Sequence, residues 1–184
     1  MPTIQMSEVP PPWRGFLRDL DQQASETVSL HCLGGFAVTM CYGLPRATAD
    51  IDVASIIPPS EGKTLVESGG FGSALHQEYK VYLERVGIVT LPENYQDRLV
   101  ELFPGAHKHL RLYALDPYDL ALSKLERNIQ RDRDDVRYLV NTIPLIREVL
   151  EARYSSELRV YIGVPERTDL TLRLWLEAFY PPEA

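Results

Sequence analysis

The 184-residue chain has few cysteines, no excess of positive charge and no long hydrophobic run. Its two cysteines, Cys32 and Cys41, lie in an apolar stretch and match no zinc-binding spacing, which predicts buried thiols in a reduced compartment. The formal net charge of -7 argues against a broad basic surface for nucleic acid, so basic residues that contact RNA must cluster locally. No apolar run approaches the ~20 residues that cross a bilayer, and the first residues lack the hydrophobic region of a signal peptide. We therefore expect a cytoplasmic protein with no membrane segment.

The composition that remains, 45% hydrophobic and 24% charged, is typical of one globular domain or of a catalytic part with a helical appendage. Hydrophobic periodicity predicts strands over residues 28–33, 49–57, 81–89 and 107–113. It predicts helices over residues 13–24, 36–42, 64–71, from 116 onward, 143–154 and 168–179, with an N-cap at Thr168. Residues 1–12 are expected to be extended, 58–62 to form a loop, and 91–99 to connect to a short helix. The pattern favours an α/β (α+β) fold with a small mixed sheet flanked by helices. Residues 1–115 would form the core, and 116–184 a helical part packed on it.

Two acidic residues stand one residue apart on the strand predicted at 49–57. Side chains alternate between the faces of a strand, so Asp50 and Asp52 share one face while Ile51 and Val53 point to the other. Paired carboxylates suit Mg²⁺ or Mn²⁺, which complete their coordination with water and substrate phosphates. The pair is either such a metal site or the solvated face of a half-buried strand.

Two glycines, Gly34 and Gly35, follow the strand predicted at 28–33 and precede the helix predicted at 36–42. Because they lack side chains, a phosphate can approach the backbone N–H groups and the N-terminus of the helix. A phosphate-binding turn is therefore predicted one short helix before the acidic pair.

This order of motifs resembles the signature of the DNA polymerase β-like nucleotidyltransferase superfamily. The residues that carry the resemblance are Leu33, Gly34, Gly35, Asp50, Ile51, Asp52 and Val53. Fourteen residues separate Gly35 from Asp50, which is long for the superfamily, and a turn at residues 43–45 would absorb the extra length. The resemblance implies the nucleotidyltransferase fold, with Mg²⁺ or Mn²⁺ held by Asp50 and Asp52. It also implies a nucleoside triphosphate donor, such as ATP, bound at Gly34 and Gly35.

A third carboxylate often lies on the next strand in this superfamily, and Glu84 is the acid available there. Such a group would complete a two-metal site. The alternative is an ion pair between Glu84 and the neighbouring Arg85.

A second group of charged residues follows a helix start predicted at Asp116, a favourable N-cap residue that precedes a proline. In one unbroken helix, Lys124 and Asp135 would lie ~16 Å apart along the axis and could not serve one phosphate. If Asp132 instead caps a new helix, a hinge near Gln130 brings the lysine and Asp135 together. We predict the hinge.

The second group resembles the later motifs of the abortive-infection nucleotidyltransferase toxins of type IV toxin–antitoxin systems, and of related uncharacterised nucleotidyltransferase domains. Asp119, Lys124 and Asp135 carry this resemblance, and Arg46 corresponds to the basic residue that these families place before the acids. It implies that Lys124 and Arg46 neutralise nucleotide phosphates, that Asp119 or Asp135 orients the lysine, and that Asp135 completes the catalytic set. The remaining charges of residues 131–137 are predicted to form helix-surface ion pairs.

The expected function is metal-dependent transfer of a nucleotide to an acceptor hydroxyl of an RNA such as tRNA, or of a protein. The closer resemblance implies a toxin with a cognate antitoxin as partner. Two alternatives stay open. One is a catalytically silent binding or regulatory module with the same fold, and the other is a small-molecule nucleotidyltransferase of the antibiotic-modifying kind.

Overall fold

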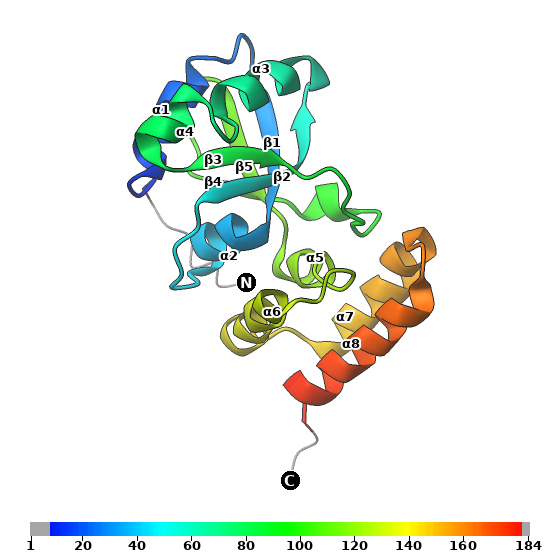
Figure 1. Ribbon diagram of the computed structural model, residues 1–184. Coiled ribbons are helices and arrows are strands. Elements are labelled where there is room, and N and C mark those ends of the chain that lie inside the picture. The colour runs from blue at the N-terminus through cyan, green and yellow to red at the C-terminus, as the bar shows by residue number, and fades with distance from the viewer. Residues whose placement is uncertain (1–7, 182–184) are drawn as a thin grey trace. The chain divides into compact units, whose positions relative to one another are not determined.

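The computed structural model describes residues 8–181, so residues 1–7 of the segment predicted to be extended lie outside the described part of the chain. The chain divides into two compact units (Figure 1). The first comprises residues 8–88 and 99–115, and the second comprises residues 89–98 and 116–181.

A five-stranded mixed sheet forms the centre of the first unit, with the strands in the spatial order β3-β2-β1-β5-β4. The strands are β1 (Val28–Leu33), β2 (Asp50–Ile57), β3 (Tyr82–Arg85), β4 (Val100–Leu102) and β5 (Leu110–Ala114). β1 pairs antiparallel with β2 and parallel with β5, while β2 and β3 are parallel and β4 and β5 antiparallel. The predicted small mixed sheet is therefore confirmed.

A bulge in β2 keeps its hydrophobic residues on one side of the sheet. The register to β1 skips one residue of β2 at Ala54. Because of this extra residue, Val53 and Ile56 are both buried, although strict alternation would place them on opposite faces. Asp50 and Asp52 lie out of phase with this set and are only half-buried. The predicted separation of acidic and apolar faces is thus observed.

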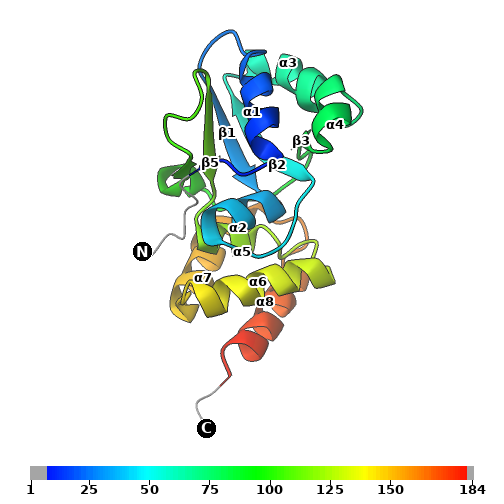
Figure 2. The ribbon, with the colours of Figure 1, turned by 90° about the vertical axis from the view of Figure 1, so that its left-hand side faces the viewer.

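The described part of the first unit has four helices, and three of them pack around α1. The four are α1 (Trp13–Asp21), α2 (Gly34–Tyr42), α3 (Pro59–Gly69) and α4 (Ala74–Tyr79). Trp13 of α1 contacts Phe36 of α2 with ring centroids 4.9 Å apart, and Phe16 contacts Tyr79 of α4 at 6.3 Å. Gly69 at the end of α3 packs directly on side chains of α1. Figure 2 shows α1 and α2 in front of the central strands. These helices cover the apolar side of the sheet.

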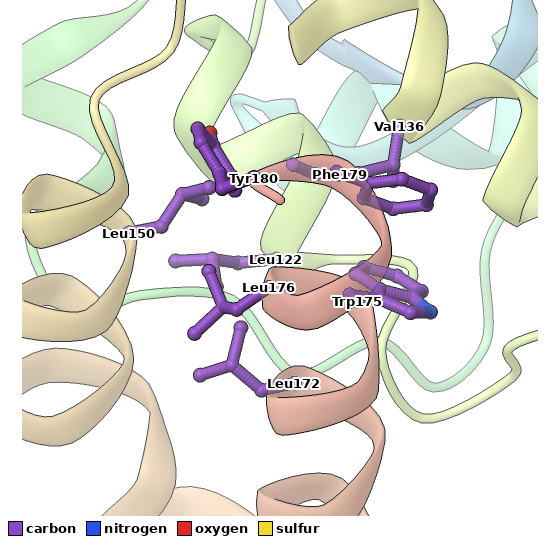
Figure 3. Close-up of a pocket in the computed structure, with 9 residues that line it drawn as sticks. Leu122, Val136, Leu150, Leu172, Trp175, Leu176, Phe179 and Tyr180 are labelled. Atoms are coloured by element: carbon purple, nitrogen blue, oxygen red, sulfur yellow. The ribbon is translucent and has the colours of Figure 1, made fainter. Parts of the chain in front are cut away.

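The second unit is helical. Its helices are α5 (Pro117–Leu122), α6 (Gln130–Thr142), α7 (Arg147–Arg153) and α8 (Pro165–Phe179). Short 3-10 helices, η1 (Tyr95–Arg98) and η3 (Arg159–Tyr161), and a π-helical turn, η2 (Tyr154–Leu158), complete it. Leu122 of α5, Leu150 of α7 and Leu176 of α8 converge in its core (Figure 3). The void between them measures about 10 Å³, far below the volume of a ligand pocket. This region is packing core.

Several predicted element boundaries were wrong, mostly at prolines. α3 begins at Pro59, inside the predicted loop, and α8 begins at Pro165, so that Thr168 lies within the helix and does not cap it. Proline lacks the N–H that the first helical residue leaves unpaired, which makes it a favourable helix start. α7 begins at Arg147 instead of Ile143, because Ile143 ends α6 and the next residue is a proline.

Some short elements were not predicted, among them the helix α4 and the strand β4. α4 has six residues and β4 has three, too few to show a clear periodicity. Strands β3 and β5 are also shorter than the predicted ranges. Within residues 8–181, the structure contains no helix with the length and hydrophobicity needed to span a membrane.

Candidate active site

Strands β2 and β3 lie side by side in the sheet (Figure 1), and three carboxylates converge there. Asp52 of β2 is the register partner of Glu84 of β3, and parallel partners point to the same face. One carboxylate oxygen from each of Asp50, Asp52 and Glu84 lies within 4.8 Å of the other two. Glu84 is exposed and makes no ion pair with Arg85, so the alternative considered for it is not what the structure shows. This group is hereafter called the acidic triad.

Two further side chains at the acidic triad were missed by the sequence prediction. The Thr48 hydroxyl donates a hydrogen bond of 2.9 Å to Oδ1 of Asp50, which holds that carboxylate in place. Tyr82 is the register partner of Asp50 and shares its face. Burial raises the pKa of Tyr82, and the charges of the triad raise it further. The same two-residue alternation that links Asp50 to Asp52 links Tyr82 to Glu84, so this signal was available in the sequence.

Gly34 lies against the acidic triad at the N-terminus of α2. Its φ of +67° is unfavourable for residues with a side chain, and a Cβ there would lie 2.2 Å from Oδ2 of Asp52. No side chain caps this helix end. The predicted glycine turn therefore abuts the acids, and only glycine fits at residue 34. α2 ends at Tyr42, and Gly43 caps it with a φ of +75°. Gly43 opens the turn that was predicted to absorb the extra length before Asp50.

The geometry of the acidic triad fits a small divalent cation. Three carboxylates are the hard ligands that Mg²⁺ and Mn²⁺ prefer. With Mg–O distances of about 2.1 Å, two ligand oxygens lie at most about 4.2 Å apart, which is close to the 4.8 Å within which the three carboxylate oxygens lie. Among the described residues, no other group of three or more potential metal ligands was found.

Arg46 also belongs to the first unit and lies in the segment that connects α2 to β2. Its backbone carbonyl accepts a hydrogen bond of 3.2 Å from the hydroxyl of Thr39 on α2, and its N–H donates to Leu44. The residue is half-buried and engaged in interactions within the fold. Its predicted role toward phosphate stays a prediction.

Lys124 and Asp135 meet in the second unit. α5 ends at Leu122 and α6 begins at Gln130, which confirms the predicted hinge. Nζ of Lys124 donates a hydrogen bond of 2.8 Å to Asp135 and lies 3.6 Å from Asp132. The N-cap is Ile129 and not Asp132, whose carboxylate accepts the Ile129 N–H from the third helical position. All three charged side chains of this cluster are at most 5% exposed.

Asp119 is fully buried and does not orient the lysine. Its carboxylate accepts hydrogen bonds from Arg98 at 3.0 and 3.1 Å and from Arg153 at 3.0 Å. Burial raises the pKa of Asp119 although both arginines act against this. Asp116 caps α5 as predicted and also pairs with Arg153. Asp135 is therefore the carboxylate that holds Lys124, and Asp119 belongs to a buried ion-pair network.

A family model described as a nucleotidyltransferase of unknown function (DUF6036) matches residues 16–175. This range contains the acidic triad, the glycine turn and the buried cluster of Lys124, Asp132 and Asp135. No curated protein and no solved structure matches the chain. The match supports the predicted nucleotidyltransferase superfamily, while the closer resemblance to abortive-infection toxins stays a prediction. The chain belongs to this family of nucleotidyltransferases of unknown function.

Proposed function

We propose that the protein transfers a nucleotide from a nucleoside triphosphate to an acceptor hydroxyl, with Mg²⁺ or Mn²⁺ held at the acidic triad. The observation that carries this proposal is the convergence of Asp50, Asp52 and Glu84 beside the uncapped, glycine-lined start of α2. Carboxylates alone would suit many cation sites. A phosphate-accepting helix end in contact with them favours a substrate that brings phosphates to the metal.

The residues of the first unit then have distinct tasks. The triad would hold the cation, and Thr48 fixes the Asp50 carboxylate through its hydrogen bond. Backbone N–H groups at Gly34 and Gly35 would receive phosphate oxygens. When bound, the cation supplies neutralisation of the charge that develops on the transferring phosphoryl group. The acceptor oxygen attacks the α-phosphorus in line, its proton passes to a carboxylate or to water, and the bond to the leaving diphosphate breaks.

The nature of the acceptor and the toxin role rest on the resemblance of the ordered motifs alone. We propose the hydroxyl of an RNA such as tRNA, or of a protein side chain, as acceptor, and a cognate antitoxin as partner. Incubation of the protein with each α-³²P-labelled nucleoside triphosphate, together with total cellular tRNA or total cell protein, identifies both donor and acceptor. Transfer of label only to an antibiotic-like small molecule would support the small-molecule alternative instead.

The decisive experiment replaces Asp50 by Asn, which keeps the size of the side chain and removes its charge. We expect loss of labelled nucleotide transfer with a melting temperature in EDTA no lower than that of the wild type, because Asp50 is half-buried and contributes little to the core. Asp134→Asn on the exposed side of α6 is the matched control and should transfer at the wild-type rate. Wild-type transfer by Asp50→Asn would refute the proposed site.

Thermal-shift measurements separate the enzyme from the catalytically silent module. An enzyme with this site should be stabilised by a nucleoside triphosphate only when Mg²⁺ is present, while a module without a donor site should show no shift. The roles predicted for Lys124 and Asp135 are tested separately by Lys124→Arg, which keeps the charge but not the shape of the ammonium. If Lys124 binds phosphate, the variant should bind the triphosphate more weakly at an unchanged affinity for Mg²⁺.

A further inference from the structure

An aromatic cluster of Phe71, His76 and Tyr82 lies next to the acidic triad. Phe71 stands in the turn between α3 and α4, His76 on α4 and Tyr82 at the start of β3. The ring centroids of Phe71 and Tyr82 are 5.3 Å apart, and those of His76 and Tyr82 are 5.1 Å apart, both with edge-to-face geometry. Phe71 and His76 lie 4.6 Å apart with their planes inclined by 35°. The three rings therefore form one contiguous group.

Phe71 is 78% exposed despite these contacts. A single exposed apolar residue is common, but this ring is held by a structured turn. The Gly72 N–H donates a hydrogen bond of 2.9 Å to Nδ1 of His76, and Ser73 caps α4 by accepting the His76 N–H at 3.1 Å. The side chain of Gln77 donates to the Gly72 carbonyl at 3.1 Å. The turn thus presents a flat apolar ring to solvent in a defined orientation.

The aromatic cluster is continuous with the acidic triad through Tyr82. Tyr82 is the register partner of Asp50, and it alternates with Glu84 along β3, so that all three side chains share one face. A substrate whose phosphates are bound at the triad therefore has an exposed aromatic surface beside it.

We propose that the aromatic cluster stacks on a nucleobase of the nucleotide substrate, with Phe71 as the contacting ring. This inference rests on the proposed nucleotidyl transfer. Every nucleobase offers a π-face to an aromatic side chain, and loss of one stacked aromatic residue weakens binding by about 5- to 150-fold, which corresponds to about 1–3 kcal/mol. The base comes either from the triphosphate donor or from the 3′ end of an RNA acceptor, and two binding measurements separate these sources.

The test compares Phe71→Ala, Phe71→Leu and Phe71→Trp with the wild type by isothermal titration in Mg²⁺. The donor probe is a nucleoside triphosphate with a non-hydrolysable α,β-methylene bridge, and the acceptor probe is a short single-stranded RNA that ends in CCA. Inorganic tripolyphosphate, which has no base, is the control ligand. Ile88→Ala, at a residue that is 96% exposed, is the control for removal of a surface hydrophobic side chain.

We expect Phe71→Ala and Phe71→Leu to weaken the binding of one of the two base-containing probes by about 5- to 150-fold. Phe71→Trp, which keeps an aromatic ring, should bind that probe about as tightly as the wild type. Tripolyphosphate should bind all variants equally, and melting temperatures should change by less than about 2 °C because the ring is exposed. A donor effect assigns the cluster to the triphosphate, and an acceptor effect assigns it to RNA. If the wild type binds the probes but no Phe71 variant changes their affinity, stacking is refuted while the proposed function stands. If the wild type binds neither tripolyphosphate nor triphosphate in Mg²⁺, both proposals fail.

Discussion

Replacement of Gly34 by Ala gives the sharpest test of the geometry around the acidic triad. The added Cβ would lie 2.2 Å from Oδ2 of Asp52, whereas carbon and oxygen atoms in contact are separated by more than 3 Å. Relief of this clash displaces the carboxylate or the start of α2 by about 1 Å. Distances at a metal site hold to within about 0.2 Å, so a shift of this size removes Asp52 as a ligand. Loss of even a supporting residue weakens metal binding by about 10–100-fold, and loss of a direct ligand should cost at least as much.

The variant also carries a backbone cost that has to be separated from the clash. An L-residue with a φ near +67° costs about 1–2 kcal/mol, whatever lies nearby. Gly105 provides the matched control, because its φ is +75° and a Cβ there would meet nothing within 4 Å. Gly105→Ala should therefore lower the free energy of unfolding by about this amount in urea titrations without metal, and Gly34→Ala should lower it by at least as much.

Binding of Mn²⁺, followed by the loss of the electron paramagnetic resonance signal of the free ion, distinguishes the two variants. Gly105→Ala should bind Mn²⁺ like the wild type, and Gly34→Ala should bind it at least about 10-fold more weakly. Nucleotide transfer should follow the same order. Equal Mn²⁺ affinity in both glycine variants would refute the inferred contact between the glycine turn and the metal ligand.

Three further predictions concern the acidic triad, the buried network and the thiols. Asp52→Asn should melt in EDTA at or above the wild-type temperature, because three carboxylates within 4.8 Å repel one another. The variant should also lose the rise in melting temperature that millimolar Mg²⁺ causes in the wild type, and a rise of wild-type size would contradict the site. Arg98→Ala leaves the fully buried Asp119 with one arginine fewer and should lower the free energy of unfolding by about 3–5 kcal/mol at neutral pH. The control Arg147→Ala, at an exposed residue, should lower it by less than about 0.5 kcal/mol, and equal losses would show that the network contributes nothing. Burial raises the pKa of Asp119, and Arg98→Ala should raise it further. The folded variant then binds the proton of Asp119 more tightly than the unfolded chain does, so its stability falls as the pH rises. The loss of stability relative to the wild type should therefore shrink on acidification to about pH 5. The two buried cysteines should react with Ellman's reagent only as fast as the protein unfolds, because burial raises the pKa of both thiols, that of Cys41 to about 11. Rapid labelling of the folded protein would contradict this prediction.

The sequence by itself was sufficient for features that depend on local periodicity. The alternation of Asp50 and Asp52 with buried neighbours follows from the two-residue repeat of a strand, and the structure shows it. The burial of both cysteines and the helix start at Asp116 also follow from short-range patterns and are confirmed. The hinge before α6 was predicted because a straight helix would have kept Lys124 and Asp135 apart.

Only the tertiary structure decided which residues meet across long stretches of the chain. Strand register placed Glu84 beside Asp52 and Tyr82 beside Asp50, and no local pattern determines the register between two parallel strands joined by a long crossover. Asp119 found its arginine partners 21 and 34 positions away, while Asp135 took the lysine. Periodicity fixes the face on which a side chain lies, but its neighbours on that face depend on how the whole chain packs.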